Sequence, residues 1–132
     1  MIVLDTHALV WWANGDESQL SPAALKAISA HTGDGEIAIS SITAWEIAML
    51  VERGRLALTM SVSQWLNTVN QITQIRFIPI DHRIAVDSTQ LPGEFHKDPA
   101  DRMIVATSRG LSAPLITADK KILDYPHVKS IW

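Results

Sequence analysis

The sequence predicts an α/β fold, a three-layer α/β/α sandwich in which helices cover both faces of a mostly parallel sheet. Two observations predict it. Short apolar runs typical of buried strands alternate along the chain with longer segments whose apolar residues have helical spacing. A polar residue follows several of these runs directly, as Asp5 follows Met1–Leu4, and marks a corner between strand and helix. Such alternation favours crossover connections, which make neighbouring strands parallel.

The expected elements can be assigned in chain order. We expect strands at Met1–Leu4, Ile37–Ser41, Arg76–Ile80 and Leu115–Thr117, with a short fifth at Val128–Trp132. We expect helices at residues 8–12, 21–31, 43–53, 58–74, 81–90 and 98–109, and a polar loop at residues 14–20. Glycine is expected to end three of the helices, at Gly33 and Gly35, at Gly54 and at Gly110. Because the chain of 132 residues has no repeat or linker, we expect a single domain over residues 1–132.

Composition narrows the chemistry that the chain can perform. It contains no cysteine, which excludes disulfides, thiolate nucleophiles and sulfur-bound zinc, and leaves carboxylates, histidines and hydroxyls. The net charge of −3 argues against a protein that coats nucleic acid with a broad basic surface, although a nuclease needs only a local basic rim. No apolar run approaches the ~18 residues of a membrane span, and no basic leader precedes the first run. We therefore expect a cytoplasmic protein.

Four carboxylates are expected at one edge of the sheet. Asp5 follows the first strand, Glu46 lies in the helix after the second, Asp119 follows the fourth, and Asp101 lies in the first turn of the helix that begins at Asp98. Helices that return from a parallel sheet begin at the carboxyl ends of its strands, so these side chains should gather there. Crowded carboxylates repel each other unless a cation lies between them, and oxygen ligands suit Mg²⁺ or Mn²⁺.

Each acid also has a local interpretation. Asp5 and Asp119 are favoured helix N-caps, and Asp101 is favoured near the positive end of a helix dipole. Thr43 and Glu46 have the spacing of a capping box. A protein in which the acids only cap helices would be a binding module with an acidic edge.

A divalent ion held by carboxylates activates water and neutralises charge on a phosphate, so phosphodiester hydrolysis is the reaction that we expect. Secondary candidates for substrate contact are Thr6, Arg102 and Lys120, with Lys97 and Lys121 as further basic residues near the acids. His7 is a lone histidine, for which a surface or structural role is favoured. Of Trp11 and Trp12, one is expected in the core and the other in contact with RNA or a protein partner.

Four segments together resemble a known family: MIVLDTHALVWW, ISSITAWEIAMLVERGRL, LPGEFHKDPADRMIVATSRG and LITADKKILDYP. They are similar, in this order, to the signature blocks of PIN-domain ribonucleases, specifically the VapC toxins of type II toxin–antitoxin pairs. The resemblance implies an α/β/α sandwich, a Mg²⁺- or Mn²⁺-dependent endoribonuclease, a homodimer and a cognate VapB-type antitoxin.

The same resemblance implies that the catalytic, metal-binding acids are Asp5, Glu46, Asp101 and Asp119. Ala100 departs from the larger residue expected between the two aspartates of this block, which affects local packing. Asp98 precedes Pro99 and is expected to cap the helix, leaving Asp101 as the metal ligand. A structure-specific DNA nuclease on the same fold remains an alternative to the ribonuclease.

Overall fold

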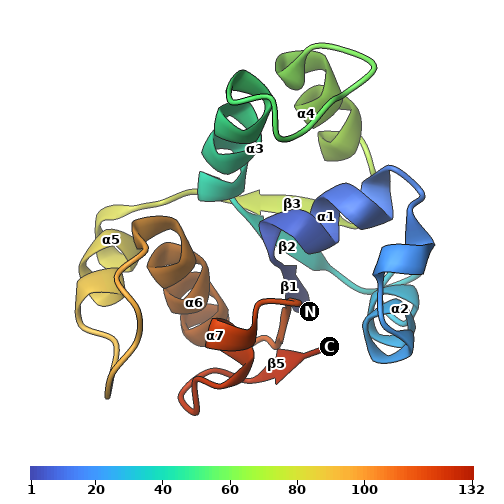
Figure 1. Cartoon of the computed structure of the whole chain (residues 1–132). Helices are drawn as coiled ribbons and strands as arrows, with labels where there is room; N and C mark the ends of the chain where they lie inside the picture. The colour runs from blue at the N-terminus through green and yellow to red at the C-terminus, as the bar shows by residue number, and fades with distance from the viewer.

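The computed structural model describes all residues from Met1 to Trp132. At its centre lies a five-stranded sheet in the order β3-β2-β1-β4-β5 (Figure 1). The strands are β1 (Ile2–Leu4), β2 (Ile37–Ser40), β3 (Ile75–Ile78), β4 (Leu115–Ile116) and β5 (Ser130–Ile131). Every pair of neighbouring strands is parallel, which confirms the predicted sheet.

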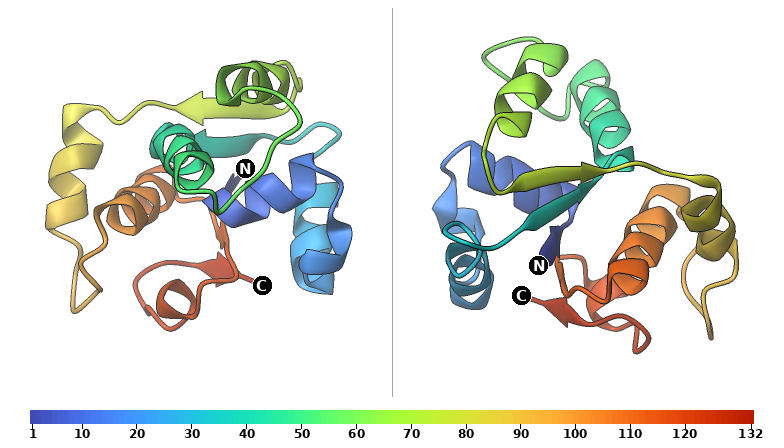
Figure 2. Two further views of the ribbon diagram at one scale, coloured as in Figure 1. Left: turned by 45° about the horizontal axis from the view of Figure 1, so that its top comes forward. Right: turned by 180° about the vertical axis from the view of Figure 1, so that it is seen from behind.

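Seven α-helices and one 3₁₀ helix surround the sheet. They are α1 (Thr6–Ala13), the 3₁₀ helix η1 (Glu17–Gln19), α2 (Pro22–Ser29), α3 (Ile42–Glu52), α4 (Val62–Asn70), α5 (His82–Thr89), α6 (Pro99–Leu111) and α7 (Lys120–Leu123). One face packs against α1, α2 and α4, and the opposite face against α5, α6 and α7, while α3 lies beside both α4 and α6 (Figure 2). The three predicted layers are therefore present. None of the helices combines the length and the apolar character that crossing a bilayer requires.

Alternation along β1 explains why this strand is apolar at every position. Ile2 and Leu4 belong to the core under α1, whereas Val3 belongs to the core under α6. Successive side chains of a strand point to opposite faces, and here both faces are covered. The central strand is consequently buried throughout.

Two helices differ from their expected bounds. The helix expected at 58–74 covers only Val62–Asn70, because Ser61 and Gln64 form a capping box that fixes its start. Gly110 does not end α6; the helix continues to Leu111 and ends at Ser112, which has φ 51° in the left-handed region. The expected loop at 14–20 contains the single turn of η1.

Strand order also determines where a ligand can enter. From β1 the chain builds outward through β2 to β3, and then returns to the other side of β1 to add β4 and β5. The crevice outside the carboxyl ends of β1 and β4, where the direction of building reverses, is the usual ligand site of open parallel sheets. Leu4 pairs with Ile116, so Asp5 and Thr117 leave the sheet side by side.

Candidate functional site

Asp5 is held rigidly where β1 ends. Its side chain is only 9% exposed. Oδ1 accepts a hydrogen bond of 2.9 Å from the amide of Thr6, and Oδ2 accepts one of 2.6 Å from the hydroxyl of Thr117. Asp5 therefore caps α1 and at the same time presents a fixed carboxylate at the switch point of the sheet.

Glu46 faces the same region from the first turns of α3. Its Oε1 accepts a hydrogen bond of 2.6 Å from the Thr6 hydroxyl, which also lies 3.0 Å from the hydroxyl of Thr43. The capping-box interpretation of Thr43 and Glu46 is wrong, because α3 begins earlier, after Ser41, and the Glu46 carboxylate is bound to Thr6 instead. The Thr6 hydroxyl orients a carboxylate.

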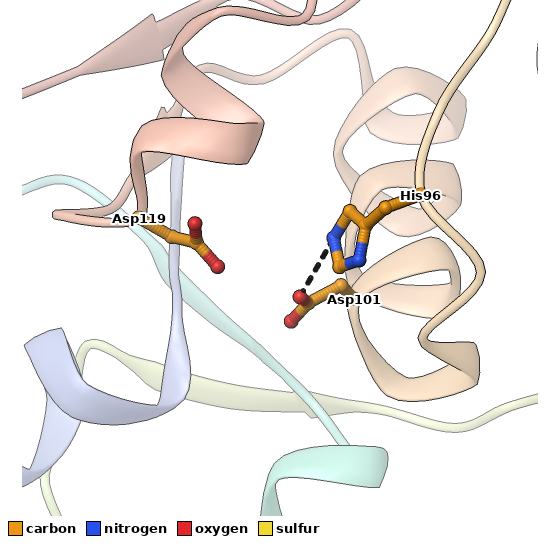
Figure 3. Close-up of side chains that lie close together, drawn as sticks. All are labelled: His96, Asp101 and Asp119. Carbon is orange, nitrogen blue, oxygen red and sulfur yellow. Dashed lines mark ion pairs between the residues drawn. The ribbon is translucent and has the colours of Figure 1, made fainter.

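Asp101 of α6 lies together with His96 from the preceding loop, and Asp119, at the start of α7, faces them (Figure 3). One ligand atom from each of His96, Asp101 and Asp119 fits within 4.8 Å of the others. Nε2 of His96 lies 3.0 Å from Oδ2 of Asp101, but outside hydrogen-bonding geometry, so this buried nitrogen has no hydrogen-bond partner. These three side chains could together coordinate a metal ion.

Besides Asp5, two further aspartates around the cleft cap helices. Asp98 Oδ1 accepts a 3.1 Å hydrogen bond from the amide of Asp101, as expected for the N-cap of α6. Asp119 Oδ1 accepts one of 2.9 Å from the amide of Lys121. The amide of Asp119 in turn donates to the Thr117 hydroxyl at 3.0 Å. Thr117 thus connects the backbone of Asp119 to the carboxylate of Asp5.

The acids surround one cleft of about 480 Å³, and its walls include Asp5, Glu46, Asp98, Asp101 and Asp119. The structure therefore brings together all four acids that the sequence predicted to converge. Burial, together with the charges of the other acids, raises the pKa of Asp101 from 3.8 to about 8. Burial also raises the pKa of Asp5 and of Glu46. A site that disfavours its own negative charges in this way favours a bound cation.

The donors present fit a hard divalent ion. Carboxylate oxygens from four segments of the chain meet at the cleft, as Mg²⁺ and Mn²⁺ prefer. The partnerless Nε2 of His96 adds one imidazole donor. His96 was not predicted from the sequence, although it lies two residues before the N-cap Asp98.

The basic candidates are placed differently from the acids. Arg102 donates to three backbone carbonyls, from Nε to Ser88 at 2.7 Å and from Nη1 to Phe95 at 3.0 Å and His96 at 3.2 Å. In the structure the Arg102 side chain has a structural role instead of the predicted contact with substrate. Its hydrogen bonds hold the backbone of the segment that carries His96. Lys120 is solvent-exposed and forms an ion pair of 3.2 Å with Asp124.

Both tryptophans of α1 are half-buried. Trp11 lines the acidic cleft, and its ring lies near those of His7 and Trp132, with centroids 5.6 and 5.9 Å apart. Trp12 packs against the core on the α1 side of the sheet.

The sequence of this chain matches a known family over nearly its whole length. The profile of the PIN domain matches residues 2–128. The chain belongs to the PIN-domain family. Among relatives, this PIN domain is 32% identical to Ribonuclease VapC22 of Mycobacterium tuberculosis over 133 residues, which is 99% of this chain and 98% of the relative.

Solved structures share the fold of this PIN domain. A chain in a toxin–antitoxin complex from Klebsiella pneumoniae is 25% identical with a TM-score of 0.66, covering 97% of this chain and 95% of its own. VapBC2 from Rickettsia felis, bound to a DNA fragment from its promoter, is 18% identical with a TM-score of 0.68, covering 98% and 97%.

Proposed function

We propose that this PIN domain is a metal-dependent endoribonuclease and the toxin of a type II toxin–antitoxin pair. The observation that carries the proposal is the convergence of four acids from separate segments on one cleft, where none of them is neutralised by a lysine or arginine. Its similarity to a protein named as a VapC ribonuclease supports RNA as the substrate.

In the proposed mechanism, Asp5, Glu46, Asp101 and Asp119 hold Mg²⁺ or Mn²⁺, with His96 beside them. When bound, the ion supplies Lewis-acid activation of water and neutralises charge on the phosphate. The chain contributes orientation. The hydroxyls of Thr6 and Thr117 bind Glu46 and Asp5, and groups that orient ligands in this way strengthen metal sites.

Other residues have supporting roles in the proposal. Deprotonated Asp101 is needed to hold the ion, so ion binding displaces a proton from its carboxyl group. Arg102 positions the segment of His96. Lys120 at the start of α7 is proposed as a mobile phosphate contact, because its side chain is 85% exposed and its ion pair with Asp124 is open to solvent.

We further propose a VapB-type antitoxin as partner, a homodimer as the assembly, and the cytoplasm as the compartment where RNA is cleaved. The proposal of an antitoxin partner is supported by the similar chain from Klebsiella pneumoniae, whose structure is that of a toxin–antitoxin complex. Co-expression with the product of the adjacent reading frame should give a stable complex that lacks RNase activity. Light scattering of the isolated chain should give the mass of two copies.

The decisive experiment is cleavage of single-stranded RNA, structured RNA and DNA in parallel, with Mg²⁺, Mn²⁺ or excess EDTA. We expect cleavage of RNA only with a divalent ion, and its loss in the Asp101→Asn variant. Cleavage of DNA alone would support the structure-specific DNA nuclease instead. Robust RNA cleavage in EDTA would refute the metal mechanism. If the protein cleaves no nucleic acid and Mn²⁺ does not raise its melting temperature, the binding module with an acidic edge is supported instead.

A further inference from the structure

A second cleft opens beside the acidic one, on the exposed side of α3. It has a volume of about 350 Å³. Ile42, Trp45 and Met49 contribute its apolar wall, and Arg53 and Arg55 also line it. Glu46 and Asp98 line both clefts, so the second is a direct continuation of the first.

Trp45 is unusually open to solvent for its size. It is 55% exposed, more than any other large hydrophobic residue of the chain. The opposite side of α3 supplies the core contacts, because Thr43 and Ile47 are fully buried. The core therefore does not require an aromatic ring at position 45. Large apolar side chains left exposed beside a cleft are typical of binding surfaces.

The exposed side of α3 combines an aromatic ring with positive charge. Trp45, Met49 and Arg53 follow one another at intervals of four residues, which places them on one face. Arg53 and Arg55 are exposed, and neither forms an ion pair within the chain. In a protein of net charge −3, two free arginines at the end of an apolar cleft form a local anion-binding feature.

We propose that this cleft binds a nucleotide of single-stranded RNA adjacent to the one whose phosphate lies at the acids. Its base stacks on Trp45, and the neighbouring phosphates contact Arg53 and Arg55. The inference rests on the proposed function and adds a substrate subsite to it. Stacking on an aromatic ring within a basic groove is the general way in which proteins hold unpaired strands.

The charge pattern favours RNA over a protein occupant. A polyanion gains from both arginines; of the two acids in the lining, Glu46 is a proposed ligand of the ion and Asp98 is bound to the amide of Asp101. An unpaired strand is also needed, since a duplex keeps its bases stacked on each other and cannot offer one to Trp45. The subsite therefore selects single-stranded segments near the cleavage point.

The test measures RNA binding separately from cleavage. Full-length protein carrying Asp101→Asn is titrated, in a buffer that contains Mn²⁺, into a fluorescein-labelled single-stranded RNA of mixed sequence. The fluorescence anisotropy of the RNA gives the Kd of the complex. Adding Trp45→Ala should weaken binding about 5- to 150-fold, the usual value of one stacked base, while Trp45→Phe should retain most of the affinity. A duplex of the same sequence should bind independently of residue 45.

Arginine variants test the phosphate contacts. Arg53→Gln and Arg55→Gln should each reduce the slope of log Kd against log salt by about 0.7 for a single strand. Val86→Ala and Arg83→Gln are matched controls at exposed positions of α5 and should change neither Kd nor slope. All variants should melt at the same temperature, since each changed side chain is exposed.

Two outcomes would overturn the subsite. One is an unchanged Kd for Trp45→Ala. The other is a change from dimer to monomer in Trp45→Ala by light scattering with the RNA affinity retained, which would make the cleft a contact between copies. RNA cleavage is measured in parallel with chains that retain Asp101, with and without Trp45→Ala. If the unmodified chain cleaves no RNA, the proposed ribonuclease is refuted. If it cleaves RNA and Trp45→Ala changes neither Kd nor KM, only the subsite is refuted.

Discussion

At the scale of single residues, hydroxyl groups determine how the carboxylates of the cleft are presented. Thr6 bridges α1 to α3 by binding Glu46, and Thr117 binds both Asp5 and the amide of Asp119. Thr117 directly follows β4, and Thr6 begins α1 two residues after β1, so the sheet sets both positions. The carboxylates consequently have fixed directions before any ligand arrives, which lowers the cost of binding one.

Two aspartates of one helix turn should respond differently to substitution. Asp98→Ser keeps an oxygen that accepts from the Asp101 amide, so it should cost less than about 1 kcal/mol of stability and leave most RNase activity. Asp101→Asn should reduce metal-dependent cleavage more than the roughly 10- to 100-fold that loss of a ligand-orienting group costs. Melting temperatures and Mn²⁺-dependent cleavage of both variants check this. An inactive Asp98→Ser with an active Asp101→Asn would reverse the assignment.

The titration of Asp101 predicts how stability depends on pH without metal. Its pKa is raised from 3.8 to about 8 in the folded protein, so the fold holds this proton more tightly than the unfolded chain does. The resulting stabilisation is complete below about pH 4 and is lost as pH rises through about 8. In EDTA, Asp101→Asn should therefore gain stability relative to the unmodified protein between these values. If the difference in melting temperature between Asp101→Asn and the unmodified protein stays the same from about pH 4 to about pH 8, the prediction is wrong.

At the scale of elements, the corners after β1 and β4 were predictable and the loop geometry was not. Apolar runs followed by a capping residue located Asp5 and Asp119 correctly, and Pro99 located the cap Asp98, because local hydrogen bonds fix such helix starts. The position of His96 depends on a loop that the Arg102 side chain holds through the carbonyls of Ser88, Phe95 and His96. The direction of Glu46 depends likewise on Thr6, 40 residues earlier. Contacts of this kind leave no periodic signal.

Two of the glycines expected to end helices, Gly54 and Gly110, should respond in opposite ways to alanine. Gly110 lies inside α6 with an ordinary backbone and open space around an added Cβ, so Gly110→Ala should stabilise the protein by about 0.4–1 kcal/mol. Gly54 has φ +68°, where alanine is strained, so Gly54→Ala should destabilise it. Urea denaturation of both variants checks the pair. Destabilisation by Gly110→Ala would show that the end of α6 needs a flexible residue.

At the scale of the whole molecule, alternation of strand and helix predicted the parallel sheet and the edge at which the acids meet. It did not predict the second cleft, because Trp45 has the helical spacing of a core residue and only the packing of α3 leaves it exposed. Side-chain exposure depends on which elements become neighbours. The three layers could be predicted from the alternation of strand and helix, whereas the exposure of side chains depends on how the helices pack in the folded chain.

Metal binding should stabilise the molecule as a unit. An ion that binds the folded cleft and not the unfolded chain adds about 2.7 kcal/mol at a concentration of 100 Kd. Mn²⁺ should therefore raise the melting temperature of the unmodified protein by several degrees and that of Asp101→Asn by much less. Equal shifts for the two proteins would place the ion outside the cleft.

The acids of the cleft come from both ends of the chain, from Asp5 in the first strand-to-helix corner to Asp119 near the last strand. A polypeptide still being synthesised has no complete set until residue 119 has left the ribosome and β4 has joined β1. Until β4 has joined β1, the carboxylates of Asp5 and Asp119 are not held beside each other, so the proposed metal site is incomplete.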